Sequence, residues 1–248
     1  MIRAMIFDLD GTLVQTERLK AISYARAAIE LCPQVLREEE VIEAFREVVG
    51  LPRREVAQRL VDRFQLQDKA RERMSEYGVD TPWQAFIQVR LGHYEQMLAD
   101  TDVIVNHQWP HNLAVLEMAR ANQCRTGLAT MSRCRQATRV LQILELQQAF
   151  DFIASRDDVE KGKPDPEIYE LVSRELEVDA AECLVLEDSA SGVAAATAAG
   201  MWCIAMTTPF THDGVHKQAL LPSEWIVDET EQVMEVVGRM LEERRLDD

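Results

Sequence analysis

The sequence predicts an α/β protein with a doubly wound parallel sheet and an inserted all-helical domain. Short apolar runs alternate with helical patterns at the start of the chain and through its second half, whereas the stretch between them shows helical patterns alone. Strands that alternate with helices of this length form right-handed βαβ units in an open sheet. We therefore expect an α/β core from residues 1–15 and 103–248, and a helical domain from residues 16–102.

Six apolar runs have the length and composition of buried strands. They are Ala4–Leu9, Thr126–Thr130, Phe150–Ala154, Cys183–Glu187, Trp202–Met206 and Trp225–Val227. Helical patterns follow at Arg135–Leu146, Glu167–Leu176, Val193–Ala199 and Thr230–Arg244. In open sheets of this kind, ligands bind beyond the carboxyl ends of the strands, where the strand order reverses.

The intervening stretch has five helical patterns and no strand pattern. The predicted helices are Glu17–Leu31, Glu38–Val49, Arg53–Phe64, Asp68–Ser75 and Trp83–Leu98. Proline and glycine turns, such as Cys32-Pro33 and Gly78-Val79-Asp80, separate them. The simplest account is a helical domain inserted after the first strand, with the sheet resuming near Val103.

The composition restricts the partners of the protein. Acidic residues number 43 against 27 basic ones, for a formal net charge of −16. Such a field repels nucleic acid and anionic lipid, so neither is an expected partner. No apolar stretch approaches the length of a membrane span, no signal-peptide pattern is present, and the five cysteines form no CxxC pair. We expect a cytoplasmic protein with reduced thiols that is a monomer or a weak dimer.

The first strand ends in the acidic segment Asp8-Leu9-Asp10-Gly11-Thr12. Residues two apart in an extended chain point to the same side, so Asp8 and Asp10 should both face the space above the strand end. Gly11 lets the chain turn sharply there. Two carboxylates this close coexist when a cation binds one, or when one stays protonated as an acid. A calcium EF-hand would need Glu at the twelfth loop position, where this chain has Leu19.

Three further polar segments lie at predicted strand ends or helix starts. Thr130 could hold a phosphate oxygen, or it could be an ordinary strand-end threonine or helix cap. Pro164 keeps Lys163 out of the helical region, so Lys163 is either a cation fixed at the site or a solvated lysine in a turn. Glu187 and Asp188 either complete an oxygen site for Mg²⁺ or cap the next helix.

Four motifs in this order resemble those of the haloacid dehalogenase superfamily of phosphotransferases. They are DLDGT at Asp8–Thr12, ATMS at Ala129–Ser132, KPDP at Lys163–Pro166 and EDS at Glu187–Ser189. The inserted helices resemble the helical cap of the branch that includes phosphoglycolate phosphatase-like and β-phosphoglucomutase-like proteins. The resemblance covers the whole chain and implies a Rossmann-like core with a cap that selects the substrate.

The resemblance implies a Mg²⁺-dependent phosphatase that acts on a small phosphorylated metabolite. Asp8 would attack the phosphorus and form an aspartyl-phosphate, while Asp10 would serve as general acid and then general base. Thr130, Met131 and Lys163 would bind the transferring phosphoryl group. The implied metal ligands are Asp8, the backbone carbonyl of Asp10, and Asp188, with Glu187 close by.

Three basic residues of the helical stretch are candidate substrate contacts: Lys20, Arg53 and Arg90. Arg53 follows Leu51-Pro52 and resembles the phosphate-binding arginine of β-phosphoglucomutase-like proteins. The alternative is that both arginines are solvated residues on helix surfaces.

The main alternative activity is that of a β-phosphoglucomutase-like sugar-phosphate mutase. That branch often has histidine where this chain has Lys20, which disfavours the mutase. Arg53, where phosphonatases use a cap lysine, disfavours a phosphonatase, and the presence of Asp10 disfavours a dehalogenase. A catalytically silent binding protein is a remoter alternative, because all the motif residues are intact. We assign no metal role to His93 or His107, because no other His or Cys lies at ligand spacing from them.

Overall fold

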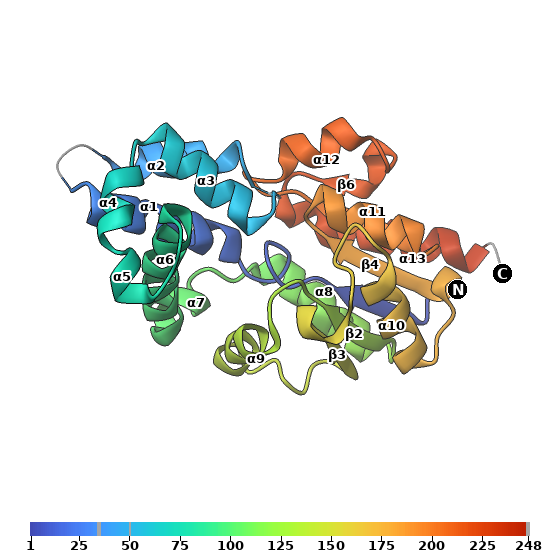
Figure 1. Ribbon diagram of the computed structural model, residues 1–248. Coiled ribbons are helices and arrows are strands. Elements are labelled where there is room, and N and C mark those ends of the chain that lie inside the picture. Colours follow the sequence, from blue (N-terminus) through green and yellow to red (C-terminus); the bar gives the residue numbers. More distant parts are fainter. Residues whose placement is uncertain (34–35, 50, 247–248) are drawn as a thin grey trace. The chain divides into compact units, whose positions relative to one another are not determined.

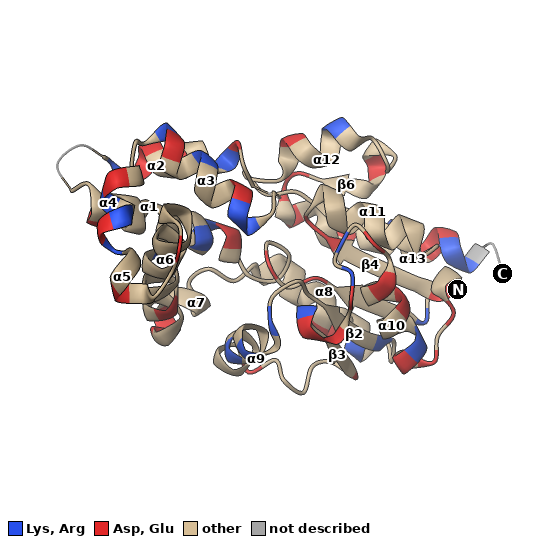
Figure 2. Ribbon diagram, in the orientation of Figure 1, with Lys and Arg blue, Asp and Glu red and all other residues tan. Residues whose placement is uncertain are grey.

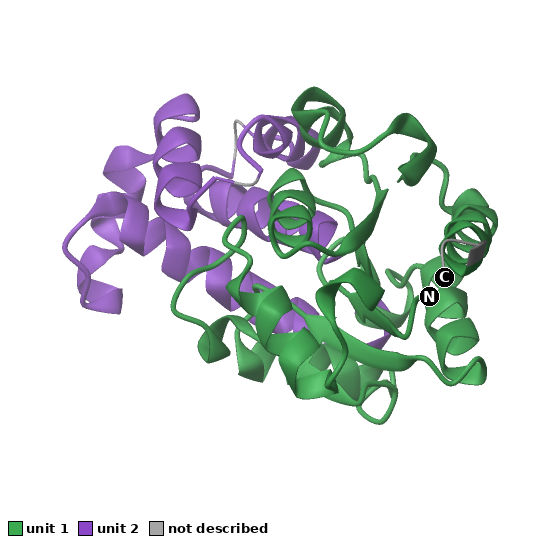
Figure 3. Ribbon diagram, turned by 90° about the vertical axis from the view of Figure 1, so that its right-hand side faces the viewer, with its two compact units in different colours: residues 1–15, 104–248 green, residues 16–103 purple. Residues whose placement is uncertain are grey.

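The computed structural model describes residues 1–33, 36–49 and 51–246 (Figure 1). The chain divides into two compact units, coloured separately in Figure 3. The first, here called the sheet unit, contains Met1–Gln15 and Ile104–Asp248. The second, here called the helical unit, is Thr16–Val103. This division lies one residue after the boundary expected at residue 102.

The sheet unit contains a six-stranded sheet in which every strand pairing is parallel, in the order β3-β2-β1-β4-β5-β6. The strands are β1 (Ala4–Phe7), β2 (Arg125–Ala129), β3 (Phe152–Ala154), β4 (Cys183–Glu187), β5 (Trp202–Met206) and β6 (Ile226–Val227). The order runs one way from β1 to β3 and the other way from β4 to β6, so the topology reverses between β1 and β4. The predicted doubly wound parallel sheet is confirmed.

Helices cover both faces of this sheet. They are α8 (Pro110–Ala121), α9 (Cys134–Ile143), α10 (Glu167–Leu176), α11 (Ala190–Ala198), α12 (His212–Gln218) and α13 (Val233–Leu246). Helices α10 and α11 pack against each other and against the central strands, and α8 packs with α13. Short 3₁₀ turns lie at Arg156–Asp158, Ala180–Glu182, Ser223–Trp225 and Thr230–Gln232.

The apolar sequence of the central strands follows from burial on both faces. All four residues of β1 and all five of β4 are buried. Ile6, Val185, Tyr169 and Val172 belong to the core between the sheet and α10. The carboxyl ends of β1 and β4, where the charged motifs begin, are therefore held by buried strands of the core.

The expectation that the sheet resumes near Val103 is wrong. Two helices precede β2: α7 (Thr101–Val105), which spans the boundary between the units, and α8. Pro110 occupies the first turn of α8, a position that proline favours, and Val115, Leu116 and Ala119 form its buried face. These buried residues have helical spacing, so the pattern was present in the sequence and was overlooked.

The described residues of the helical unit form helices and no strand, as the sequence predicted. The helices are α1 (Thr16–Leu31), α2 (Glu38–Arg46), α3 (Arg53–Arg63), α4 (Gln67–Glu72), α5 (Met74–Tyr77) and α6 (Pro82–Ala99). Helix α6 packs against α1, α3, α4 and α5. The aromatic ring of Tyr24 on α1 stacks on the ring of Phe45, with ring centroids 5.4 Å apart. The centroid of the Phe86 ring on α6 lies 5.8 Å from that of Tyr24.

Three predicted helices of this unit have the observed bounds to within one residue at each end, and the other two differ more. The pattern at Asp68–Ser75 is two short helices that meet at Arg73, and Gly78 ends the second in the left-handed conformation (φ 61°). The pattern at Glu38–Val49 ends as a helix at Arg46. The ends of a helix are its least sharply defined parts, because the last turns fray.

Acidic and basic residues are both frequent along α2, α3 and α4 (Figure 2). They form pairs three or four residues apart, such as Arg37–Glu40, Arg59–Glu55 and Arg71–Asp68. Exposed pairs of this kind add little to the stability of the fold, so these charges mainly keep the helix surfaces hydrated. None of the described helices is long and apolar enough to cross a membrane.

Candidate active site

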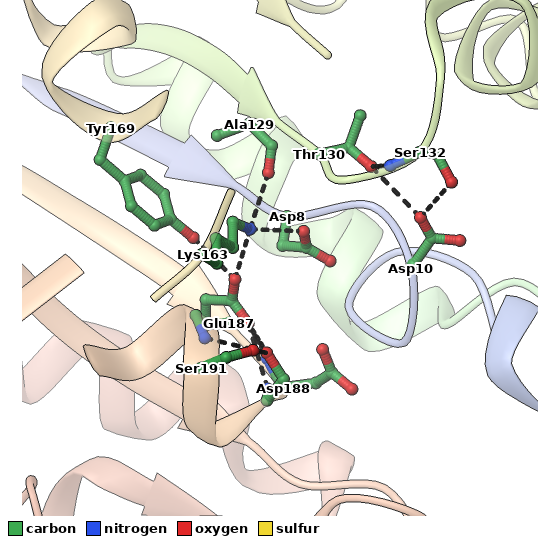
Figure 4. Close-up of polar contacts among 12 residues, drawn as sticks. Asp8, Asp10, Ala129, Thr130, Ser132, Lys163, Tyr169, Glu187, Asp188 and Ser191 are labelled. Atoms are coloured by element: carbon green, nitrogen blue, oxygen red, sulfur yellow. Dashed lines mark hydrogen bonds and ion pairs between the residues drawn. The ribbon is translucent and has the colours of Figure 1, made fainter. Parts of the chain in front are cut away.

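The carboxyl ends of β1, β2 and β4 bring three of the four motifs to one edge of the sheet. Phe7 of β1 lies in register with Leu128 of β2 and with Leu186 of β4. Asp8 directly follows Phe7, and Thr130 and Asp188 each follow two residues after those partners. Register therefore brings the three residues to the same edge of the sheet, with Asp8 between Thr130 and Asp188 (Figure 4).

The loop after β1 turns back on itself at Gly11. This residue has a φ of 94°, a conformation open to glycine and strained for other residues. Its N–H donates to the carbonyl of Val14 at 2.7 Å, and the buried Asn112 side chain donates to the carbonyl of Thr12 at 2.6 Å. The sharp turn predicted for Gly11 is present, and it fixes the position of Asp10 in the loop after β1.

Lys163 is buried at the centre of the site. Its Nζ lies 2.7 Å from Asp8 Oδ1, 2.9 Å from the carbonyl oxygen of Ala129 and 2.5 Å from Glu187 Oε1, and its side chain is only 3% exposed. The three ammonium protons therefore each have an acceptor. Lys163 is therefore not a solvated turn lysine. It lies in the loop before α10, and its peptide bond to Pro164 is cis.

Glu187 accepts hydrogen bonds on both carboxylate oxygens. Besides Lys163, the hydroxyl of Tyr169 donates to Oε1 at 2.8 Å. The Oε2 atom accepts from the backbone N–H groups of Asp188 and Ser189 and from the Ser189 hydroxyl, at 3.0–3.1 Å. A Cβ atom on Gly192 would overlap this carboxylate. The glycine at the start of α11 thus makes the space into which Glu187 fits.

Asp10 is held by two hydroxyl groups. Thr130 Oγ1 donates to Asp10 Oδ2 at 3.2 Å, and Ser132 Oγ donates to the same oxygen at 2.5 Å. The N–H of Ser132 in turn donates to Thr130 Oγ1 at 3.0 Å. Ser132 was not identified from the sequence as a site residue, although it ends the ATMS motif two residues after Thr130.

Burial and charge set the protonation of the central groups. The pKa of Asp8 is raised well above its ordinary value, because burial disfavours the carboxylate and the charges of Glu187 and Asp10 add to this effect; Lys163 opposes it. Burial alone would raise the pKa of Glu187, but the Lys163 ammonium and the hydrogen bonds outweigh it, and the pKa lies below its ordinary value. The pKa of Lys163 is raised despite burial, because both carboxylates stabilise its charge.

Three buried carboxylates could hold a metal ion at this edge. Oxygen atoms of Asp8, Glu187 and Asp188 all lie within 4.8 Å of one another. When all three acids are ionised, Lys163 supplies one positive charge among them, and a dication would balance the remainder. An all-oxygen set of carboxylates suits a hard cation such as Mg²⁺, and the residues present fit the expected metal.

The charges of all three candidate basic residues of the helical unit act on the Tyr24 phenol, and Arg90 contacts its ring directly. Arg90 is buried, with its guanidinium 5.0 Å from the Tyr24 ring and 4.5 Å from the Tyr94 ring. Burial raises the pKa of the Tyr24 phenol, while the positive charges of Arg90, Arg53 and Lys20 all oppose that shift. Arg90 is therefore not a solvated arginine, whereas Arg53 is exposed at the start of α3.

Met131 is half-buried between Thr130 and Ser132 and packs against the sheet core. Its sulfur would lie 2.9 Å from a Cβ atom placed on Gly162. Its side chain therefore contacts the loop that carries Lys163.

Comparison with known proteins identifies the class to which this fold and site belong. Residues 2–200 match the family model of haloacid dehalogenase-like hydrolases, and the chain belongs to this family. The predicted superfamily is thereby confirmed, and the protein is a hydrolase.

Individual relatives agree with this assignment. The chain is 29% identical over 239 residues to a phosphorylated carbohydrates phosphatase of Thermotoga maritima, covering 96% of this chain and 99% of the relative. It is 28% identical to the validoxylamine A 7'-phosphate phosphatase of Streptomyces hygroscopicus subsp. limoneus, covering 86% and 88%. A solved structure described as a putative β-phosphoglucomutase from Thermotoga maritima matches with a TM-score of 0.72 and 25% identity, covering 96% and 99%. The prediction of a phosphatase agrees with the names of the first two.

Proposed function

We propose that the protein hydrolyses a small phosphorylated carbohydrate through an aspartyl-phosphate on Asp8, with Mg²⁺ as cofactor. One observation carries this proposal: the buried Lys163 ammonium pairs with both Asp8 and Glu187, next to Asp188, at the carboxyl ends of β1 and β4. The chain belongs to a family of hydrolases, which agrees with this chemistry. A buried cation beside a buried carboxylate is what an anionic nucleophile needs to approach an anionic phosphate.

In the first step, an Asp8 carboxylate oxygen attacks the phosphorus and the bond to the sugar oxygen breaks. Asp10 gives its proton to that leaving oxygen. In the second step, water attacks the phosphorus of the aspartyl-phosphate, Asp10 takes the proton from the water, and Asp8 leaves as a carboxylate together with inorganic phosphate. Splitting hydrolysis in this way replaces one difficult step by two easier ones.

The hydrogen bonds to Asp10 suit its role as acid and base. Thr130 and Ser132 hold the carboxylate in one orientation through Oδ2. Positioned proton transfer of this kind contributes roughly 10²–10⁴-fold in rate. Ser132 is accordingly a positioning residue in the proposed mechanism.

Asp8, the backbone carbonyl of Asp10, and Asp188 would hold Mg²⁺. When bound, the ion would offset the negative charge of the nucleophile and the phosphate. We revise the expected role of Glu187 from metal neighbour to positioning residue, because both its oxygens already accept hydrogen bonds from Lys163, Tyr169 and the start of α11. Its carboxylate fixes the lysine that faces the phosphoryl group.

The helical unit would act as the cap that recognises the sugar. Arg53, Arg90 and Lys20 concentrate positive charge around Tyr24 in a protein of net charge −16. The names of the two phosphatase relatives, for phosphorylated carbohydrates and for validoxylamine A 7'-phosphate, support a small phosphorylated substrate, with a sugar phosphate as our choice.

The test is release of inorganic phosphate from a panel of sugar phosphates, 2-phosphoglycolate, nucleoside monophosphates and p-nitrophenyl phosphate, with Mg²⁺ or with EDTA. We expect release that EDTA abolishes, with the highest kcat/KM on a sugar phosphate. No release from any compound contradicts the proposal, and preference for a nucleotide contradicts the substrate class.

A sugar-phosphate mutase is the second candidate, and the cluster of basic residues around Tyr24 is the observation that favours it. Such a cluster could hold a second phosphate group while Asp8 exchanges the first. Conversion of β-glucose 1-phosphate to its 6-phosphate isomer with little phosphate release would identify this activity. Rapid phosphate release from the same compound would exclude it.

A further inference from the structure

A second group of side chains that could bind a metal lies outside the site described above. His212 and His216 are on α12, and Asp228 directly follows β6. One possible ligand atom from each lies within 4.8 Å of the other two. All three side chains are exposed to between 38% and 50%, so an ion could enter from solvent.

The two histidines face the same way because they are four residues apart on a helix. Their ring centroids are 4.4 Å apart. His216 Nε2 lies 2.9 Å from Asp228 Oδ1, and His212 Nε2 lies 3.9 Å from the same oxygen. The ligand atoms of a tetrahedral metal with bonds of about 2.0–2.1 Å are separated by roughly 3.3 Å. Small side-chain rotations would therefore bring all three atoms to bonding distance.

Neighbouring groups already orient two of these ligands. Thr207 Oγ1 donates to Asp228 Oδ1 at 2.7 Å, and the Thr207 N–H donates to the carbonyl of Val227 at 2.9 Å. Asp213 Oδ1 lies 3.1 Å from His212 Nδ1. A carboxylate at Nδ1 favours the tautomer with its proton there, which leaves the Nε2 lone pair directed toward a metal. Outer hydrogen bonds of this type are a regular feature of metal sites with histidine ligands.

We propose that His212, His216 and Asp228 bind a first-row transition-metal dication such as Zn²⁺, with water completing the coordination. Two imidazoles and one carboxylate suit Zn²⁺, Ni²⁺ or Cu²⁺, whereas Mg²⁺ prefers oxygen ligands alone. The site thus differs in metal preference from the carboxylates around Asp8. The positive charge of Lys217, which is close enough to lower the pKa of Asp213, opposes the binding of a cation. The net charge of −16 of the whole protein favours cation binding.

The bound metal would join α12 to the end of β6. His216 and Asp228 are twelve residues apart in the chain, and α12 also packs against α11. A metal bond across this loop would restrict the movement of α12 relative to the sheet. The site therefore predicts that Zn²⁺ raises the unfolding temperature of the protein.

Calorimetric titration with ZnCl₂ tests the proposal. The protein is first freed of metal, its exposed thiols, such as Cys134, are alkylated, and excess Mg²⁺ is added to occupy the carboxylate site. We expect one tight Zn²⁺ per chain, bound at least about 10-fold more weakly by His216→Ala and by Asp228→Asn. Thr207→Val should weaken binding about 10–100-fold, because it removes the hydrogen bond that orients Asp228.

His111→Ala is the matched control, because His111 is a partly exposed histidine with a carboxylate, Glu231, at 4.0 Å, and among the described residues it belongs to no group of three possible metal ligands. Its affinity for Zn²⁺ should equal that of the unsubstituted protein. Substituting Co²⁺ should give a visible absorption spectrum that His216→Ala removes. Equal Zn²⁺ affinity in His216→Ala and the unsubstituted protein, or an equal loss in His111→Ala, overturns the proposal. Unchanged circular dichroism and Mg²⁺-dependent phosphate release would show that the variants are folded.

Discussion

Lys163 is the single residue on which the site geometry depends most. It contacts Asp8, which directly follows β1, and Ala129 and Glu187, which end β2 and β4. The centroid of the Tyr169 ring lies 4.9 Å from its Nζ. Burying this many charges is stabilising only while they stay paired. Removing the lysine would leave Asp8 and Glu187 as neighbouring buried anions.

Lys163→Met should therefore lower both activity and stability. We expect kcat/KM to fall by about 10²–10³-fold, the loss typical of one electrostatic partner of the transition state. The free energy of unfolding should fall by about 3–5 kcal/mol, because a buried ion pair loses one member. Lys161→Met is the control: its side chain is 72% exposed and its ammonium lies 3.4 Å from Asp165, so neither quantity should change. Equal effects of the two substitutions would contradict this assignment.

Asp8→Asn should change the pH dependence of stability. The pKa of Asp8 is raised in the folded state above the ordinary value of 3.8, so the folded protein holds this proton at pH values where the unfolded chain has lost it. Stability from this group is thus present below pH 3.8 and is lost as the pH rises toward the folded-state pKa, by up to about 1.4 kcal/mol per pH unit. Because asparagine cannot ionise, the Asp8→Asn protein does not lose this stability as the pH rises.

The measurement is the unfolding free energy of both proteins in EDTA from about pH 4 to about pH 8. As the pH rises, the unfolding free energy of the Asp8→Asn protein should increase relative to that of the unsubstituted protein. A difference that stays constant over this range would show that Asp8 is ionised throughout. Added Mg²⁺ should stabilise the unsubstituted protein more than the variant, since a ligand stabilises the state that binds it.

At the scale of elements, the sequence predicts the strands better than the loops between them. The strands Cys183–Glu187 and Trp202–Met206 and the helix Glu167–Leu176 have the bounds that were predicted. Buried parallel strands are continuous apolar runs with polar residues at their ends, so their limits are visible in the sequence. The helix α8 was missed because its pattern lies within a mixed segment that was assigned to the returning sheet.

The site shows a similar limit. The motif residues Asp8, Thr130, Lys163 and Asp188 could be found because each follows a strand or precedes a helix. The pairing of Glu187 with Lys163 could not, because the contact joins residues 24 positions apart through side chains whose directions the sequence does not give. His212, His216 and Asp228 were missed for the same reason, although the spacing of the two histidines on a helix was a usable signal.

Gly192→Ala tests how the start of α11 supports the site. Alanine inside a helix is normally better than glycine by about 1 kcal/mol. At this position, however, the new Cβ would displace the Glu187 carboxylate and with it Lys163. We expect lower stability and a lower kcat. Gly238→Ala on α13, where a Cβ would meet nothing within 4 Å, should be neutral or stabilising. A stabilised, fully active Gly192→Ala protein would contradict the packing described here.

At the scale of the whole molecule, the two units have separate chemical characters. The sheet unit carries the buried carboxylates and Lys163, and the helical unit carries the basic residues around Tyr24. This division agrees with a proposed division of labour, in which the sheet unit performs the reaction and the helical unit selects the substrate. Residues of the helical unit should then affect selectivity more than the chemical step.

Arg53→Ala tests that division. We expect KM for the preferred sugar phosphate to rise about 10-fold, the typical effect of losing a charged hydrogen bond, while kcat on p-nitrophenyl phosphate stays unchanged. The neighbouring Arg54, whose guanidinium lies 5.6 Å from the Trp83 ring, supplies the control: Arg54→Ala should leave both constants unchanged. An equal loss of kcat on both substrates in Arg53→Ala would place this residue in the chemical step instead.

The central claim is that Asp8 carries the phosphoryl group, and chemical trapping tests it most directly. The protein is mixed with its preferred sugar phosphate and Mg²⁺, quenched in acid during turnover and treated with borohydride, which reduces an acyl phosphate to an alcohol. Mass spectrometry of the peptide that contains Asp8 should then show homoserine at position 8, and the Asp8→Asn protein should show neither the product nor phosphate release. Turnover without modification at Asp8, or with the modification at Asp10, would contradict the account.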